Sequence, residues 1–189
     1  MANNKTIMTV AVLGGTGKEG SGLALRWANS GYNIIIGSRS AERAEQKADE
    51  LNMLLEAGIV SGFHNIEAAQ KADLVVLSVP YQAHKPTLES VRDAVQGKIL
   101  VDVTVPLKPP KVREVFLPEG QSAALEAQAI LGEDVQVVTA FQNVSAEHLK
   151  SLEHLVECDV LVCGDDKEAV DEVIKLVQAA GMHQESLHQ

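Results

Sequence analysis

A glycine-rich loop that directly follows an apolar, β-branched segment is the feature that most constrains this chain. The segment Thr6–Leu13 predicts a buried strand, and an apolar repeat over 20–29 predicts a helix. Between them lie Gly15, Gly17 and Gly20, spaced as G-x-G-x-x-G. In such a unit the first glycine permits a tight turn, the second lets the backbone approach a pyrophosphate, and the third lets the helix pack on the strand. The spacing therefore predicts a loop that binds a dinucleotide at a helix N-terminus.

Strands and helices alternate along the rest of the chain. Further strands are predicted at 33–37, 59–63, 74–79, 99–103, 135–139 and 160–163. Helices are predicted after the cap Ser40 as far as Leu55, at 66–71, at 81–95 with Pro86 limiting its start, at 122–131, and from the cap Asp165 to Gly181. The proline-rich stretch 106–121 is expected to be an ordered loop. This order predicts an α/β fold, a Rossmann-type doubly wound and mostly parallel sheet, as a single domain over residues 1–189. Ligands of such sheets bind beyond the carboxyl ends of the strands.

The end of the second predicted strand indicates which dinucleotide binds. An NAD site usually has Asp or Glu there to hold the ribose 2′-hydroxyl. This chain has Gly37-Ser38-Arg39-Ser40, with Arg43 one helical turn further on. A hydroxyl and two guanidinium groups suit a 2′-phosphate. The sequence therefore predicts NADP(H) as the cofactor.

Charge and composition exclude several other classes of protein. The net charge of −10 argues against a general nucleic-acid binder. The apolar runs are too short for a membrane span, so we expect a cytoplasmic protein. Cys158 and Cys163 lack the companions of a zinc site and predict buried, inert thiols. Asp165 and Asp166 are explained by the predicted helix cap, so no metal site is expected.

Four motifs together resemble a known family. Gly14-Gly15-Thr16-Gly17, Gly37-Ser38-Arg39, Ser78-Val79-Pro80 and Cys163-Gly164-Asp165-Asp166 are similar to segments of the NADPH-dependent reductases of the deazaflavin coenzyme F420, with Val103-Thr104-Val105-Pro106 between the last two. The resemblance covers nearly the whole chain. It implies an oxidoreductase that moves a hydride between C4 of the nicotinamide and C5 of F420, or of a flavin such as FMN or FAD. Such a transfer needs two stacked rings in a dry site, and we expect no catalytic acid or base from the protein.

The resemblance also implies residue roles. Thr16, Gly17, Lys18 and Glu19, beside Gly15, would line the pyrophosphate, and Ser38, Arg39 and Arg43 would hold the 2′-phosphate. Ser78, Val79 and Pro80 would pass beside a ribose. Val103 to Val105 and the stretch Ala140 to Ser145 would lie near the nicotinamide. His84, at the mouth of the site, would be either a cofactor contact or a solvated histidine of the first helical turn, and the second reading is favoured.

Two departures from the family keep other functions open. The family commonly has a histidine where this chain has Gln142, and its members continue past the last helix with a segment that helps to form a dimer and the deazaflavin pocket. Here a polar tail over 182–189 is expected instead. The sequence is therefore compatible with a homodimer but does not require one. The alternatives are an NADP-binding sensor without catalysis and an NADPH-dependent reductase of a small carbonyl or imine substrate.

Overall fold

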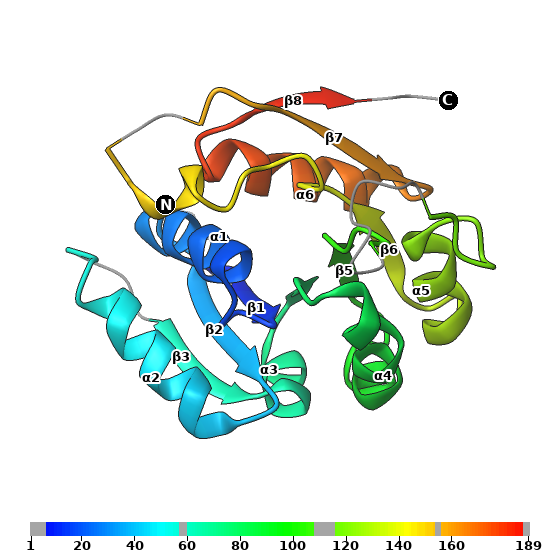
Figure 1. The fold of residues 1–189 in the computed structure, drawn as a ribbon, viewed down its shortest axis with the longest axis horizontal. Coiled ribbons are helices and arrows are strands. Elements are labelled where there is room, and N and C mark those ends of the chain that lie inside the picture. Colours follow the sequence, from blue (N-terminus) through cyan, green and yellow to red (C-terminus); the bar gives the residue numbers. More distant parts are fainter. Residues whose placement is uncertain (1–6, 57–59, 108–115, 154–155, 187–189) are drawn as a thin grey trace, which may run out of the picture.

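The computed structural model describes residues 7–56, 60–107, 116–153 and 156–186, and its strands form one twisted sheet (Figure 1). The strands lie in the order β3-β2-β1-β4-β5-β6-β7-β8. Their bounds are β1 (Thr9–Leu13), β2 (Asn33–Ser38), β3 (Val60–His64), β4 (Leu74–Leu77), β5 (Ile99–Asp102), β6 (Gln136–Thr139), β7 (Asp159–Gly164) and β8 (His183–Ser186). Strands β1 to β6 are all parallel to one another. The predicted Rossmann-type, mostly parallel sheet is confirmed.

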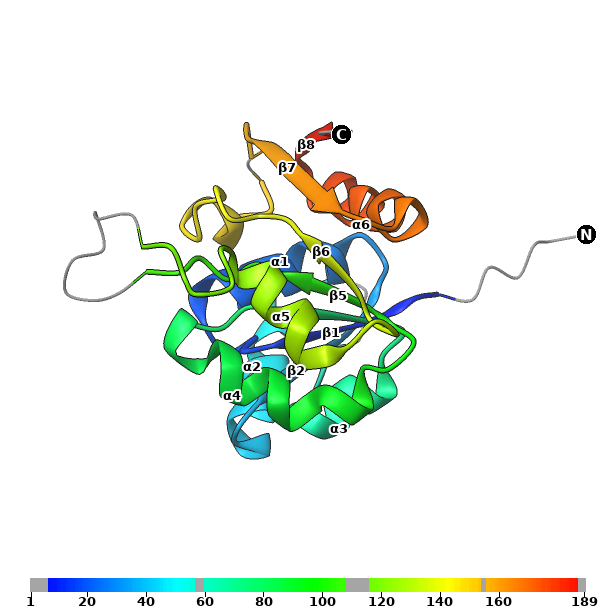
Figure 2. The ribbon, with the colours of Figure 1, turned by 90° about the vertical axis from the view of Figure 1, so that its right-hand side faces the viewer.

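Helices cover both faces of the sheet, as Figures 1 and 2 show. They are α1 (Lys18–Asn29), α2 (Ala41–Asn52), α3 (Asn65–Lys71), α4 (Tyr81–Val91), α5 (Ala123–Leu131) and α6 (Lys167–Ala179), with short 3₁₀ turns at Arg92–Ala94 and His148–Lys150. Side chains of β1 alternate between two cores: Val10 and Val12 pack with α1, α2 and α6, whereas Ala11 and Leu13 pack with α3, α4 and α5. Burial on both faces explains why the central strands are apolar throughout rather than alternating.

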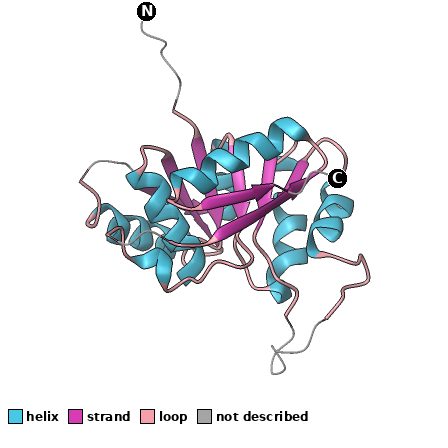
Figure 3. Cartoon of the chain, turned by 90° about the horizontal axis from the view of Figure 1, so that it is seen from above, coloured by secondary structure: helices cyan, strands magenta, loops and turns pink. Residues whose placement is uncertain are grey.

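The C-terminal part of the sheet differs from the sequence prediction. Strand β7 runs antiparallel to β6, with Thr139 opposite Cys163. The segment expected to be a polar tail instead forms β8, which pairs with β7 in parallel at the edge of the sheet (Figure 3). Backbone hydrogen bonds hold an edge strand whatever its side chains, so a polar sequence gave no signal there.

Three helix predictions are also corrected. Pro86 does not delay α4, which begins at Tyr81 with the proline inside it. Helix α6 is capped by Asp166, whose carboxylate accepts a hydrogen bond from the Ala169 N–H at 2.7 Å, and not by Asp165. Helix α2 ends at Asn52, three residues before the expected Leu55. The predicted cap Ser40 is confirmed, since its side chain accepts a hydrogen bond from the N–H of Arg43. Ser122, the first residue of the segment predicted to be helical, caps α5 in the same way.

Some predictions fall partly outside the described residues, namely the strand starts at Thr6 and Ile59 and the middle of the loop 106–121. Within the part of the chain that is described, no helix is both long enough and apolar enough to span a bilayer.

Candidate functional site

The glycine loop makes a tight turn from β1 into α1. Gly14 has a φ of +76°, and a Cβ there would lie 2.2 Å from the carbonyl oxygen of Ser78. The N–H of Gly17 then donates to the carbonyl of Gly14 at 2.9 Å, and Gly17 is the N-cap of α1. A Cβ at Gly20 would lie 3.0 Å from the Cα of Gly15, so the helix packs directly on the loop. The close packing predicted for Gly20 is therefore confirmed, whereas the residue with the left-handed backbone in the turn is Gly14, one position before the predicted Gly15.

A cavity of about 290 Å³, here called the β1–β2 cavity, opens beside this loop. It brings together three groups of predicted residues, from the ends of β1, β2 and β4. Its lining is Gly14, Thr16, Gly17, Ser38, Arg39, Ser40, Arg43, Asn65, Ser78, Val79, Pro80, Ala83 and Thr87. The lining contains two arginines and no carboxylate, and it therefore favours an anionic ligand.

Lys18 and Glu19 lie on the first turn of α1 and are not part of that lining. Lys18 is exposed and forms an ion pair with Glu147 at 3.5 Å. Glu19 is half-buried, and burial raises the pKa of its carboxyl to about 7. A carboxyl group that is partly protonated near neutral pH opposes a nearby phosphate less than an ionised one.

A second cavity of about 420 Å³, the β5–β6 cavity, lies beyond the carboxyl ends of β5 and β6 and beside the N-terminus of α5. Most of its lining was not predicted. It consists of Asp102, Thr104, Pro106, Gln121, Ser122, Ala123, Ala124, Leu125, Gln128, Val137, Thr139, Gln142, Cys163, Gly164 and Asp165. The mixed polar and apolar lining at the strand ends suits a ring system that carries a few hydrogen-bonding groups.

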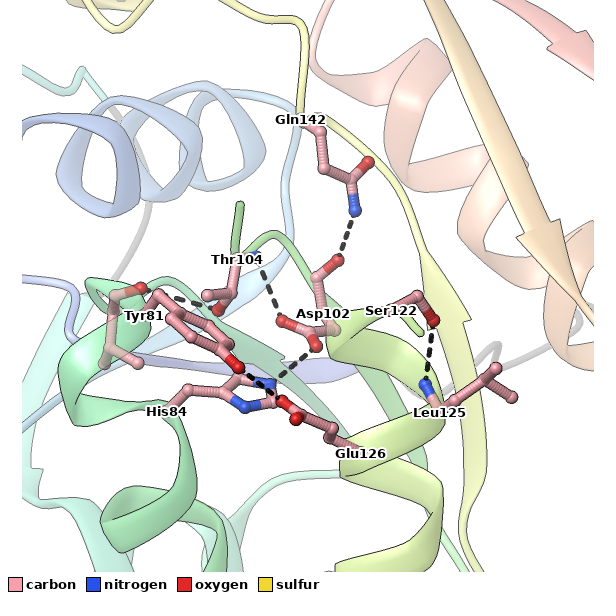
Figure 4. Close-up of polar contacts among 9 residues, drawn as sticks. Tyr81, His84, Asp102, Thr104, Ser122, Leu125, Glu126 and Gln142 are labelled. Atoms are coloured by element: carbon pink, nitrogen blue, oxygen red, sulfur yellow. Dashed lines mark hydrogen bonds and ion pairs between the residues drawn. The ribbon is translucent and has the colours of Figure 1, made fainter. Parts of the chain in front are cut away.

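The wall of the β5–β6 cavity contains a buried histidine–aspartate pair (Figure 4). Nε2 of His84 lies 2.8 Å from Oδ2 of Asp102, and each side chain is 1% exposed. Oδ1 of Asp102 accepts the N–H of Thr104 at 2.9 Å, and the Asp102 carbonyl accepts the side-chain amide of Gln142 at 2.8 Å. The expectation of a solvated His84 is therefore wrong, because α4 turns this side chain into the interior, toward the end of β5.

His84 also borders a third space of about 380 Å³, the α4–α5 cavity. The other lining residues are Tyr81, Lys85, Glu119, Gly120, Glu126, Ala129 and Ile130. The Tyr81 ring stacks on the His84 ring, and its hydroxyl donates to Glu126 at 2.8 Å. Burial, followed by the hydrogen bond to Glu126, raises the pKa of Tyr81 to about 12, so this phenol stays protonated.

Besides Lys18 and Glu19, two further predicted residues do not present side chains to these cavities. Val103 is 3% exposed and Ala140 is 0% exposed, and both belong to the core. Their neighbours Thr104 and Gln142 line the β5–β6 cavity instead. Thr104 follows Val103 by one position, as expected for alternation between two faces, whereas Gln142 follows Ala140 by two positions across the left-handed residue Phe141. A carboxylate at the end of a buried apolar strand was the signal that could have identified Asp102.

The cysteine and aspartate expectations need one further correction. Cys158 is half-buried and Cys163 is exposed, so the prediction of two buried thiols is wrong. Cys163 and Asp165 instead line the β5–β6 cavity. Among the described residues, no group of three or more His, Cys, Asp or Glu side chains has an arrangement that could hold a metal ion.

Comparisons with known proteins agree with this architecture. Residues 9–106 match the family model described as NADP oxidoreductase coenzyme F420-dependent. The F420-dependent NADP reductase of Methanocaldococcus jannaschii is 43% identical over 180 residues, which cover 89% of this chain and 78% of that protein. The enzyme of the same name from Methanothermobacter thermautotrophicus is 40% identical over 178 residues, covering 91% of this chain and 77% of the relative.

A solved structure supports the fold independently. A hypothetical protein from Sinorhizobium meliloti superposes with a TM-score of 0.80 at 21% identity, covering 98% of this chain and 86% of that one. The family match covers more than half of the chain, and relatives of at least 40% identity cover about nine-tenths of it. The chain therefore belongs to the family of coenzyme F420-dependent NADP oxidoreductases.

Proposed function

We propose that this protein transfers a hydride between NADPH and coenzyme F420, with C4 of the nicotinamide and C5 of the deazaflavin as the exchanging atoms. The observation that carries the proposal is the presence of two cavities at the carboxyl ends of one parallel sheet, in a member of this family. The β1–β2 cavity is cationic, and the β5–β6 cavity is of mixed polarity and large enough for a ring system.

The β1–β2 cavity would take the adenosine half of NADP(H). Arg39 and Arg43 would bind the 2′-phosphate with the hydroxyl of Ser38, and the backbone of Gly15 to Glu19 would meet the pyrophosphate at the N-terminus of α1. Ser78, Val79 and Pro80 would lie along the cofactor where it passes β4. The free first turn of α1 adds the positive end of a helix dipole to this anion site.

The β5–β6 cavity would take the nicotinamide together with the ring of the second substrate. Thr104, Thr139 and Gln142 offer hydrogen-bonding groups at the strand ends. Two residues there have left-handed backbone, Gln121 with φ 69° and Phe141 with φ 71°. Such conformations are costly for residues other than glycine and tend to gather at functional sites. Gln121 lines this cavity and Phe141 directly precedes Gln142, which also lines it, and this supports a site whose geometry is held in place.

The test is a stopped-flow measurement of F420 absorbance with NADPH carrying deuterium at C4. We expect the F420 band to bleach and the deuterium to appear at C5 of the deazaflavin. Parallel reactions with FMN and FAD establish whether the acceptor is specifically a deazaflavin. Tight NADPH binding without reduction of any of the three would contradict the proposal and favour an NADP-binding sensor. Turnover of a small imine or ketone instead would favour the other alternative.

The cellular location and the assembly are part of the same proposal. A cytoplasmic protein is supported by two free thiols, Cys158 and Cys163, which a reducing compartment preserves. A homodimer is proposed from the family resemblance, and light scattering on the purified protein tests it directly. A mass of about 20 kDa, that of the 20.2 kDa chain, would contradict the dimer.

A further inference from the structure

The His84–Asp102 pair separates two cavities. Asp102 lines the β5–β6 cavity, and His84 lines the α4–α5 cavity, while the two side chains meet at 2.8 Å (Figure 4). The pair therefore lies between the β5–β6 cavity and the α4–α5 cavity. Both groups can hold a proton, which distinguishes the pair from the apolar core around it.

One atom of the pair has no hydrogen-bond partner. Nδ1 of His84 is buried and unpaired among the described residues. A buried polar atom without a partner is costly and calls for a specific explanation. Charged or polar groups from three elements surround the imidazole ring. Asp102 comes from β5, and Tyr81 and Lys85 come from α4. Glu126 comes from α5, and Glu119 from the segment before α5. Water entering the α4–α5 cavity could complete the hydrogen bonding of Nδ1.

The proposed reaction needs a proton as well as a hydride. When the C4–H bond of NADPH breaks, its electron pair forms the new C–H bond at C5 of the deazaflavin and NADP⁺ remains. The reduced deazaflavin then takes one proton on a ring nitrogen, so the full exchange consumes one H⁺. We expected from the sequence that no side chain of the protein acts as an acid or base, and the buried His84–Asp102 pair is the observation that leads us to revise that expectation for the proton.

We propose that the His84–Asp102 pair supplies this proton to the β5–β6 cavity and removes it when the reaction runs in reverse. The inference rests on the proposed function. Nε2 of His84 passes its proton to Oδ2 of Asp102, the member of the pair that lines the cavity, and from there the proton reaches the substrate. Water in the α4–α5 cavity returns one proton to the pair at Nδ1. Asp102 is then the catalytic residue, and His84 acts through it.

The alternative is that the pair only holds α4 against β5 and moves no proton. The experiment must distinguish this structural role from proton transfer. His84→Gln can keep a hydrogen bond to Asp102 but cannot carry a proton. His84→Ala leaves a space next to the α4–α5 cavity, which added imidazole can enter. Ser90→Ala, in the same helix but outside all three cavities, is the matched control. For each variant we would measure F420 reduction in single turnovers, proton uptake with a pH indicator, NADPH affinity by fluorescence, and the imidazole resonances of His84 by NMR.

The expected result is a loss of about 100-fold in the rate of F420 reduction for His84→Gln, the lower range for a lost general acid. NADPH affinity should change by less than about 2-fold, because the His84 side chain lines neither of the two cavities proposed for the cofactor. Imidazole should restore much of the rate of His84→Ala and none of that of His84→Gln. The Nε2-bound proton of His84 should give a downfield NMR signal that is absent in Asp102→Asn.

Two results would overturn the inference. One is a His84→Gln variant that reduces F420 at the rate of the Ser90→Ala control. The other is a folded, NADPH-binding His84→Ala variant that imidazole does not accelerate. If the unsubstituted protein binds NADPH but does not reduce F420, the proposed function itself fails and the inference fails with it.

Discussion

The ring of Phe141 lies edge-on against the indole of Trp27, with ring centroids 5.7 Å apart and an interplanar angle of 72°. Both rings are completely buried. Phe141 has a φ of 71°, an uncommon value for a bulky residue. The backbone bend at Phe141 directs the next residue, Gln142, toward the carbonyl of Asp102. Packing in the core therefore holds a strained turn at the edge of the β5–β6 cavity.

This relationship predicts an unusual order of stability at position 141. Phe141→Ala should lower the free energy of unfolding by about 3–5 kcal/mol through loss of the ring. Phe141→Gly removes the same ring but tolerates a positive φ, so it should be more stable than Phe141→Ala by about 1 kcal/mol. Urea denaturation of the two variants measures the difference. Glycine as the less stable of the two would show that the backbone at Phe141 is not strained.

Arg39 provides the test of cofactor selectivity. Arg39→Ala should remove a charge-assisted hydrogen bond to the 2′-phosphate, worth about 1.5–3 kcal/mol or roughly 10- to 100-fold in NADPH affinity. NADH affinity should barely change, because NADH has no phosphate there. Calorimetry with both cofactors measures the effect, and Arg92→Ala, outside the β1–β2 cavity, serves as the control. An equal loss for NADPH and NADH would argue against a role of Arg39 at the 2′-phosphate.

Two glycines of the same loop should respond differently to substitution. A Cβ at Gly17 would meet only the Gly14 carbonyl, at 3.3 Å, so Gly17→Val should fold yet lose binding of either cofactor, because the side chain occupies the path of the pyrophosphate. A Cβ at Gly14 would lie 2.2 Å from the Ser78 carbonyl, so Gly14→Ala should destabilise the fold itself. Thermal denaturation and fluorescence titration separate the two effects. Normal NADPH affinity in Gly17→Val would contradict the proposed course of the cofactor.

Much of the fold could be predicted because local signals and tertiary structure agree. The apolar β-branched runs become the central strands, and the glycine spacing becomes the turn into α1. Ser40 caps α2 as expected, because its side-chain oxygen can reach the third N–H of the helix. Where two aspartates are adjacent in the sequence, the sequence does not distinguish the cap, and in the structure it is Asp166.

The structure brings predicted residues together where local motifs specify the backbone, and it departs from the prediction where side chains from different elements meet. The β1–β2 cavity gathers residues from loops whose sequences carry their own motifs. The His84–Asp102 contact joins residues 18 positions apart on different elements, and no local pattern specifies it. A periodicity did exist, since His84 lies one turn before Leu88 and two turns before Val91 on the buried side of α4. The exposure of a polar residue was inferred from its type, although its place on the helix indicated burial.

Glu19 makes stability depend on pH. Burial raises the pKa of its carboxyl from an ordinary 4.5 to about 7 in the folded protein. Between these two pH values the folded state binds more protons than the unfolded state, so the free energy of unfolding falls as the pH rises and levels off above pH 7. A fully buried group with this shift would contribute about 3 kcal/mol. Because Glu19 is only half-buried, we expect about 1 kcal/mol.

Glu19→Gln should remove this penalty, because glutamine fills the same space without ionising. The melting temperature should rise by about 2–4 °C at pH 8 and stay nearly unchanged at pH 5, where Glu19 is already protonated in the folded state. Thermal denaturation monitored by circular dichroism at both pH values measures the change. Glu42→Gln is the matched control, since Glu42 occupies the first turn of α2 but is exposed, and it should not raise the melting temperature at either pH. An equal gain for Glu19→Gln at pH 5 and pH 8 would show that the effect comes from packing and not from ionisation of the carboxyl.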